Sequence, residues 1–278
     1  MLGGPTDEHR FVGLMLLPKI LEHSNDPLAE GAVHRQAAFD ALDLQFVGRL
    51  LTSGSGENAA QMRAVALAVL SVFAGEPQFS AAAASLAKCL VTALSAEAMV
   101  EHPDLKIAED VHGTLRGVAL SAEASLALTQ AGGTAAAFKL LVALDGAATQ
   151  DAAPIANGIG RCVHVILDIA AACDSPEHQT QVWGANAEET VALIGTTLGS
   201  SNSLLKFVAL DLFAPALLLL QNASLATQSP VHSAWVAEAR NGLCSILSAR
   251  IGVSERYAAL LAVATLCDHL GPTDWLFQ

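Results

Sequence analysis

Two stretches of the sequence place cysteine, histidine and aspartate close together, the side chains that metal sites and proton transfer use. One stretch holds Cys162, His164 and Asp168, and the other is Cys-Asp-His at 267–269. Residues two apart on a helix point to different faces, so neither Cys162 with His164 nor the pair at 267 and 269 can share a metal ion. Structural zinc needs four ligands, usually as two closely spaced pairs. We therefore expect no metal and no other cofactor.

His164 and Asp168 lie four residues apart, which puts them on one face of a helix. They could form an acid–base couple or a simple hydrogen-bonded pair. We predict the hydrogen-bonded pair, since such neighbours commonly interact along a helix surface. An enzyme with an unrecognised site near these two residues is kept as an alternative.

Two glycine-containing segments, GSGENA at 54–59 and GIGRCV at 158–163, have a faint similarity to phosphate-binding loops. A dinucleotide-binding loop must follow a strand and keep its third glycine, and neither segment does so. We interpret the first as a turn and the second as the start of a helix. The sequence also lacks a phosphate-binding loop with its lysine and the Gly-x-Ser-x-Gly turn of hydrolases. We therefore expect a protein that is not an enzyme.

Composition indicates an all-α protein. About a fifth of the residues are alanine, the strongest helix former, while aromatic residues make up only 5%. Strands are normally richer in alternating β-branched and aromatic residues.

Charge excludes two classes of partner. The chain holds 14 Lys and Arg against 27 Asp and Glu, a net charge of −13, and its basic residues are scattered singly. Nucleic-acid binding depends on clustered lysine and arginine, so nucleic acid is not expected as a partner. An acidic surface also disfavours attachment to anionic lipid.

The spacing of the cysteines and the length of the apolar runs indicate where in the cell the protein is located. Five cysteines, an odd number at wide spacing among apolar neighbours, indicate buried thiols in a reducing cytosol. The apolar runs at 11–17 and 207–220 are shorter than the ~20 residues of a membrane span. The first run follows acidic residues and lacks a cleavage site, so it is no signal peptide. We expect a cytoplasmic protein without a transmembrane segment.

Helical segments of roughly 12–25 residues alternate with short Gly, Pro, Asn, Asp and Ser breaks. The segment 58–74 places Met62, Val65, Ala66, Val69, Leu70 and Phe73 on one apolar stripe. Asp104 after a proline predicts a helix start, and Gly132 with Gly133 predicts a stop. Pro18 is expected to kink or split the first helix.

The number of helices favours stacked repeats over a compact bundle. We predict an armadillo/HEAT-like α-solenoid of about ten to twelve helices, built from helix pairs of about 40 residues. Glycines one turn apart at 113–117 (GTLRG) and 195–199 (GTTLG) would let helices approach closely.

The order of several segments resembles the neurochondrin family. The segment 7–21 (DEHRFVGLMLLPKIL) and the segment 35–53 (RQAAFDALDLQFVGRLLTS) match its N-terminal part, and 131–138, 205–220 and 247–276 match later parts. The positions that carry the resemblance are Phe11, Lys19, Phe39, Asp40, Phe46, Arg49, Leu50, Gly132, Gly133, Lys206, Phe207 and Trp275. The segment 75–110 is only loosely similar. Family chains are longer, so 1–278 is expected to form a single helical domain, the N-terminal part of such a protein.

This resemblance implies a cytoplasmic armadillo-like scaffold that binds segments of partner proteins and has no catalytic residues. In the family such binding is linked to neurite outgrowth, receptor tails and restraint of a calmodulin-dependent kinase. A structural or regulatory subunit of a larger complex is the alternative. Most matched positions are expected to be structural. Arg49 is expected in a buried ion pair or as a helix C-terminal charge, rather than as an exposed anchor for a partner's acidic group.

Overall fold

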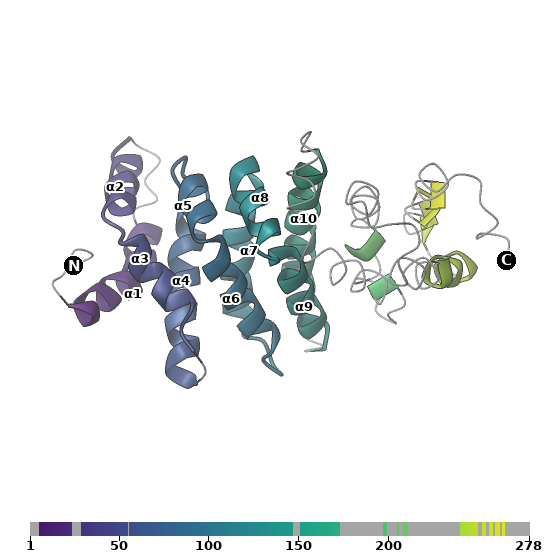
Figure 1. Cartoon of the computed structure of the whole chain (residues 1–278), viewed down its shortest axis with the longest axis horizontal. Coiled ribbons are helices and arrows are strands. Elements are labelled where there is room, and N and C mark those ends of the chain that lie inside the picture. The colour runs from purple at the N-terminus through teal and green to yellow at the C-terminus, as the bar shows by residue number, and fades with distance from the viewer. Residues whose placement is uncertain are drawn as a thin grey trace.

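The computed structural model of the chain describes residues 6–23, 29–54, 56–146 and 151–172, with shorter stretches between residues 197 and 264. Within these residues the α-helix is the only regular secondary structure. Ten helices follow one another up to residue 172 (Figure 1). Their bounds are α1 (Asp7–His23), α2 (Ala29–Asp40), α3 (Leu44–Leu51), α4 (Glu57–Phe73), α5 (Phe79–Ser85), α6 (Ala87–Ala98), α7 (Leu105–Ala119), α8 (Ala122–Gln130), α9 (Gly133–Gly146) and α10 (Ala152–Ala171).

Helices of the same kind recur every third position along the chain. The long helices α1, α4, α7 and α10 begin at residues 7, 57, 105 and 152, and each packs against the next. The shorter helices follow the same rule, since α5 packs on α8, and α6 packs on both α3 and α9. Figure 1 shows these layers standing side by side in chain order. The predicted all-α solenoid of armadillo/HEAT type is therefore confirmed, but its unit has three helices where we expected two.

Each unit has three helices because the chain bends sharply between its second and third helices. α5 meets α6 at an angle of 72° around Leu86, and α8 meets α9 at 78°. Gly132 at the second corner has φ of +89°, the left-handed backbone that favours glycine, so the predicted stop there is confirmed. Leu86 is no turn former, which is why the sequence showed no break in this region. In the described chain no single helix has the length and apolar character to cross a membrane, whereas the two angled pairs reach that length only together.

Glycines let the long helices approach each other. A Cβ atom on Gly113 would lie 2.0 Å from the Ser71 hydroxyl oxygen, and one on Gly117 would lie 2.5 Å from the Phe79 ring. The predicted close approach at 113–117 is thus confirmed, between α7 and both α4 and α5. Of the similar segment at 195–199, only residues 197 and 198 lie within the described chain.

Helix α1 continues through Pro18, so the predicted split is wrong. Proline removes the bond that its N–H would have donated to the carbonyl of Leu14. Leu14, Leu17 and Leu21 are nevertheless buried on both sides of it, against the rest of the core. This packing on either side of the proline stabilises the helix across the missing hydrogen bond.

The predicted stripe on α4 is largely correct. Ala66, Val69, Leu70 and Phe73 are fully buried, and the Phe73 ring meets Phe39 edge-on at 5.3 Å between centroids. Met62, expected on the same stripe, is 38% exposed. Its position belongs to the surface described next.

Candidate functional site

Four of the residues that carry the family resemblance line one groove at the N-terminal end of the solenoid. Phe11 of α1 lies across from Phe46, Arg49 and Leu50 of α3, around a space of about 440 Å³. We call this space the N-terminal groove. Its lining consists of Asp7, Glu8, Phe11, Val12, Phe46, Arg49, Leu50, Ser53 and Met62. The lining is mainly apolar and carries two acids and one base.

Asp43 fixes the two helices that form the groove. Its carboxylate accepts a hydrogen bond from the backbone N–H of Phe46 at 3.0 Å, which caps the start of α3. The other carboxylate oxygen lies 3.0 Å from Nη1 of Arg10 on α1. One side chain therefore starts α3 and also ties it to α1.

Arg49 lies in the last turn of α3, where a positive charge faces the helix C-terminus. Its guanidinium lies 3.2 Å from the Asp7 carboxylate and 5.3 Å from the centroid of the Phe46 ring. More than half of its side chain is exposed. A buried ion pair at Arg49 is therefore wrong. The position of Arg49 in the last turn agrees with the expected helix C-terminal charge, and its exposure agrees equally with the anchor that we did not favour.

The buried ion pair lies instead between Arg63 of α4 and Glu97 of α6, which the sequence analysis missed. Arg63 Nε is 2.9 Å from Glu97 Oε1, and both side chains are more than nine-tenths buried. Nη1 of Arg63 also donates to the carbonyl oxygens of Ser53 and Gly54, at 3.1 and 2.9 Å. These bonds hold the chain that leaves α3, and with it the end of the groove at Ser53.

The remaining family-motif residues take other roles. Phe39 is buried against Phe73, and exposed Asp40 accepts a hydrogen bond from Gln36 at 2.7 Å. Lys19 is exposed on α1. Gly132 and Gly133 form the α8–α9 corner. Lys206, Phe207 and Trp275 lie outside the described residues.

The predicted pair at His164 and Asp168 is present on α10, with 3.4 Å between Nε2 and Oδ2. Neither residue lines the N-terminal groove or the second groove described below. The segment 158–163, expected to start a helix, lies inside α10. Among the described residues, no three His, Cys, Asp or Glu side chains lie together in a way that could hold a metal ion.

Three cysteines fall within the described residues. Cys162 is buried, and burial raises the pKa of its thiol to about 11 while the nearby charge of Arg116 opposes that rise. Cys89 is partly buried and Cys244 is exposed, so the expectation of buried thiols holds for Cys162 and is wrong for Cys244. A high thiol pKa makes Cys162 a poor nucleophile.

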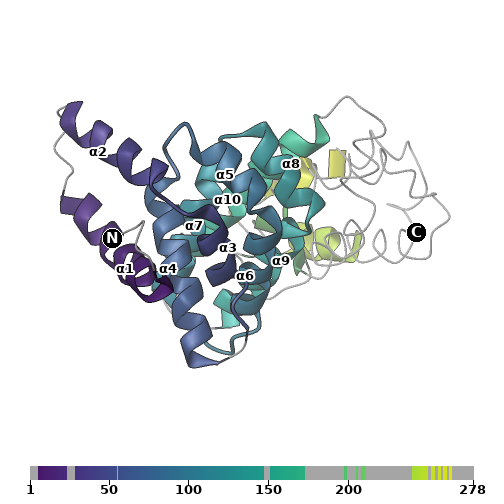
Figure 2. The same cartoon turned by 60° about the vertical axis from the view of Figure 1, so that its left-hand side comes forward.

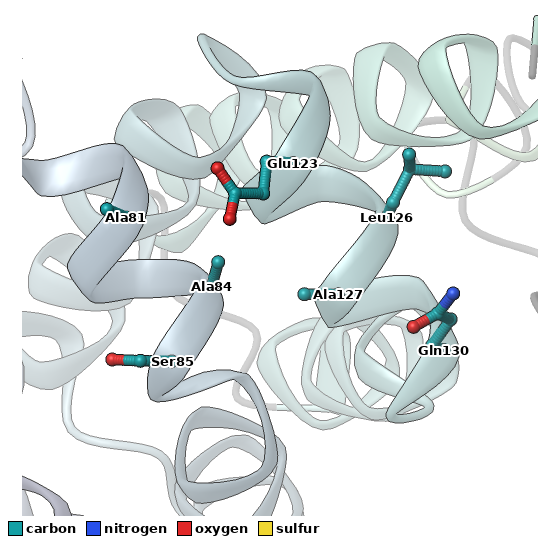
Figure 3. Close-up of a pocket in the computed structure, with 7 residues that line it drawn as sticks. All are labelled: Ala81, Ala84, Ser85, Glu123, Leu126, Ala127 and Gln130. Atoms are coloured by element: carbon teal, nitrogen blue, oxygen red, sulfur yellow. The ribbon is translucent and has the colours of Figure 1, made fainter.

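A second groove of about 690 Å³ lies between α5 and α8. Figure 3 shows Ala84 and Ala127 pointing into the space between the two helices, with Glu123 towards one end. Small side chains account for its width, since alanine fills little of the gap. Its lining contains no cluster of groups that selects a ligand.

Comparison with known proteins agrees with this architecture. The family model described as Neurochondrin matches residues 1–278. Among solved structures, the chain is similar to two engineered proteins from a structural genomics programme, at 18% and 16% identity and TM-scores of 0.55 and 0.53. Each match covers 96% of this chain, and 94% and 96% of the engineered chains. These two matches concern the fold alone. No curated protein matches the chain.

Proposed function

Because the chain belongs to the neurochondrin family, we propose that it is a non-enzymatic scaffold that binds a segment of a partner protein in the N-terminal groove. Family membership supports the scaffold-like role. The observation that carries the site is the convergence of Phe11, Phe46, Arg49 and Leu50 on one groove. Residues distant in sequence thus form one surface that is mainly apolar and carries a few charged side chains, as binding sites for protein segments commonly do.

The family's links to neurite outgrowth, receptor tails and kinase regulation give the first partners to test. A cytoplasmic location is part of the same proposal, and the wide spacing of the five cysteines supports it. The alternative, a regulatory subunit of a larger complex, would use the same groove for a permanent neighbour. In that case the chain would co-purify with its neighbouring subunit in a fixed stoichiometry.

The test compares two matched substitutions, Val12→Glu in the groove and Val142→Glu on α9. The two valines are 49% and 45% exposed, so either charge should be accommodated without unfolding. Proteins captured from cells of the source organism are quantified by mass spectrometry, and circular dichroism confirms that both variants stay folded. We expect Val12→Glu to lose a set of partners that Val142→Glu retains. Identical captured sets would contradict the groove as the binding site.

A further inference from the structure

Helix α1 carries a second apolar face, opposite the one it buries. Val12, Met15, Leu16 and Ile20 are between 40% and 57% exposed. They follow helical spacing and lie on the far side of α1 from buried Leu14, Leu17 and Leu21. Exposed Lys19 lies on the same face, four residues after Met15, so the face is apolar apart from this lysine. We call these four residues the α1 stripe. An isolated exposed apolar residue is ordinary, but four on one face of one helix are not.

The α1 stripe lies at the open end of the solenoid. Figure 2 shows α1 and α2 at the outer edge of the stacked helices. A terminal repeat normally has a polar outer face, because no further repeat covers it. The outer face of α1 instead exposes four large apolar side chains around Lys19, an arrangement more typical of a face that another helix packs against.

The α1 stripe and the N-terminal groove form one continuous surface. Val12 belongs to both, and Met15 lies one turn further along α1 on the same side. A single elongated binding segment lying along α1 would therefore contact the groove and the stripe together. The axis of the bound segment would follow α1, whose stripe spans about two and a half turns.

The charges around the groove and on the whole chain favour a positively charged binding segment. The basic side chains nearby already have partners, since Arg10 and Arg49 share Asp7 and Lys19 on the stripe makes an interaction of its own. No lysine or arginine among the described residues lies within ion-pair distance of Glu8. The hydrogen bond from Thr6 holds the pKa of Glu8 below its usual value, so this exposed carboxylate is ionised at neutral pH. With a net charge of −13, the whole chain also attracts cationic segments and repels anionic ones.

A second copy of the chain is a poor occupant for two reasons. The copies would meet carrying −13 each. Contact between the two α1 stripes alone, with four half-exposed side chains from each copy, would also bury far less than the ~800 Å² per partner of a typical stable interface. A partner helix that enters the groove as well as covering the stripe gains area from both.

We propose that the N-terminal groove and the α1 stripe together bind an amphipathic helix from a partner protein, apolar on one face and flanked by lysine or arginine. This inference rests on the proposed scaffold function and names the class of segment bound. Apolar side chains at helical spacing pack on the stripe and in the groove, in the manner of a helix bound in an apolar groove. A basic residue at one end of the bound helix pairs with Glu8.

The test uses synthetic peptides and the full chain. One peptide of about four turns has leucines on one helical face and lysines beside them, and its analogue carries glutamates in place of the lysines. A third peptide has the lysine composition but prolines that prevent a helix. Fluorescence anisotropy should show the lysine helix binding about tenfold or more tightly than either of the others. Equal binding of all three would overturn the proposal.

Matched variants locate the binding surface. The double substitution Met15→Ser with Leu16→Ser should weaken binding of the lysine helix on the order of tenfold. Met99→Ser with Leu120→Ser, at positions 87% and 75% exposed, removes the same side chains elsewhere and should leave binding unchanged. Glu8→Lys should weaken binding about threefold, whereas Glu101→Lys, also at an exposed site, should not. Equal losses in the test and control variants would overturn the proposal.

Two further outcomes separate this inference from the proposed function. If Val12→Glu removes cellular partners while no lysine helix binds, the scaffold stands and the helical class of its partner is wrong. If neither result is obtained, both proposals fail. Sedimentation equilibrium tests the second copy: a dimer that Met15→Ser with Leu16→Ser dissociates would show that the chain itself covers the stripe, which overturns the proposal.

Discussion

At the scale of single residues, the Arg63–Glu97 pair has the largest energetic consequence. Both side chains are buried, and Arg63 additionally satisfies the two carbonyl groups that follow α3. A buried pair adds little net stability compared with apolar residues, but removal of one partner leaves an uncompensated charge. The sequence could not predict this pair, because its members lie 34 positions apart on different helices.

We therefore predict that Glu97→Ala lowers the free energy of unfolding by about 3–5 kcal/mol. The double variant Arg63→Met with Glu97→Met should lose much less, because no buried charge remains. Urea unfolding followed by circular dichroism measures both. A double variant as unstable as Glu97→Ala would show that the backbone contacts of Arg63, and not its charge, dominate.

His112 gives a prediction on pH. Burial, and secondarily the charge of Arg116, lower the pKa of His112 below the ordinary histidine value of 6.5. The unfolded chain therefore takes up this proton at a higher pH than the folded chain does. Stability associated with His112 is present above pH 6.5 and falls as the pH drops below that value.

The measurement compares thermal unfolding of the natural chain and of His112→Gln between pH 7.5 and 5. We expect the natural chain to lose more stability over this range than the variant, which cannot titrate at residue 112. The remaining histidines act alike in both proteins. Parallel pH profiles would contradict a lowered pKa at His112.

At the scale of elements, local sequence signals predicted those boundaries that have a local cause. The start of α7 follows from Asp104, whose carboxylate accepts from the backbone N–H groups of Lys106 and Ile107. The corner at Gly132 follows from its backbone conformation. The corner at Leu86 has no such signal, because tertiary packing sets it, with α5 mainly against α8 and α6 mainly against α9. For this reason helix pairs were predicted where the molecule has triplets.

The candidate site was predictable only in part. Sequence order identified Phe11, Phe46, Arg49 and Leu50 as family positions, but most were expected to be structural. Their common groove depends on how α1 and α3 both pack on α4, a tertiary arrangement with no local pattern. Exposed Met62 shows the same limit, since helical period alone placed it in the core.

The contact between α7 and its neighbours gives a prediction for an element. Gly117 on α7 leaves no space for a side chain, since a Cβ would lie 2.7 Å from the carbonyl oxygen of Ala74. Gly117→Ala should therefore lower the free energy of unfolding by about 1–3 kcal/mol, although alanine favours the helix. Gly75→Ala is the control, because nothing lies within 4 Å of a Cβ there. Equal stability of the two variants would show that α7 can shift at no cost.

At the scale of the whole molecule, the solenoid divides stability among neighbouring layers. Each long helix contacts the one before it and the one after it, so α7 is held by α4 and α10. Helix α1 is held from one side and exposes its other face. In such a stack, stability is approximately a sum of repeat and nearest-neighbour terms, and a terminal layer can open without the rest.

We expect Leu17→Ala in α1 and Leu115→Ala in α7 to differ in how far their effects spread, although both residues are buried. Each loses about 2–5 kcal/mol of packing. Hydrogen exchange measured by mass spectrometry should show faster exchange in α1 alone for Leu17→Ala, because only the end layer is weakened. Leu115→Ala should accelerate exchange in α4, α7 and α10 together, because α7 joins the other two. Faster exchange throughout the chain in both variants would contradict this layered stability. It would also mean that a helix bound to the α1 stripe stabilises the whole molecule and not only its end.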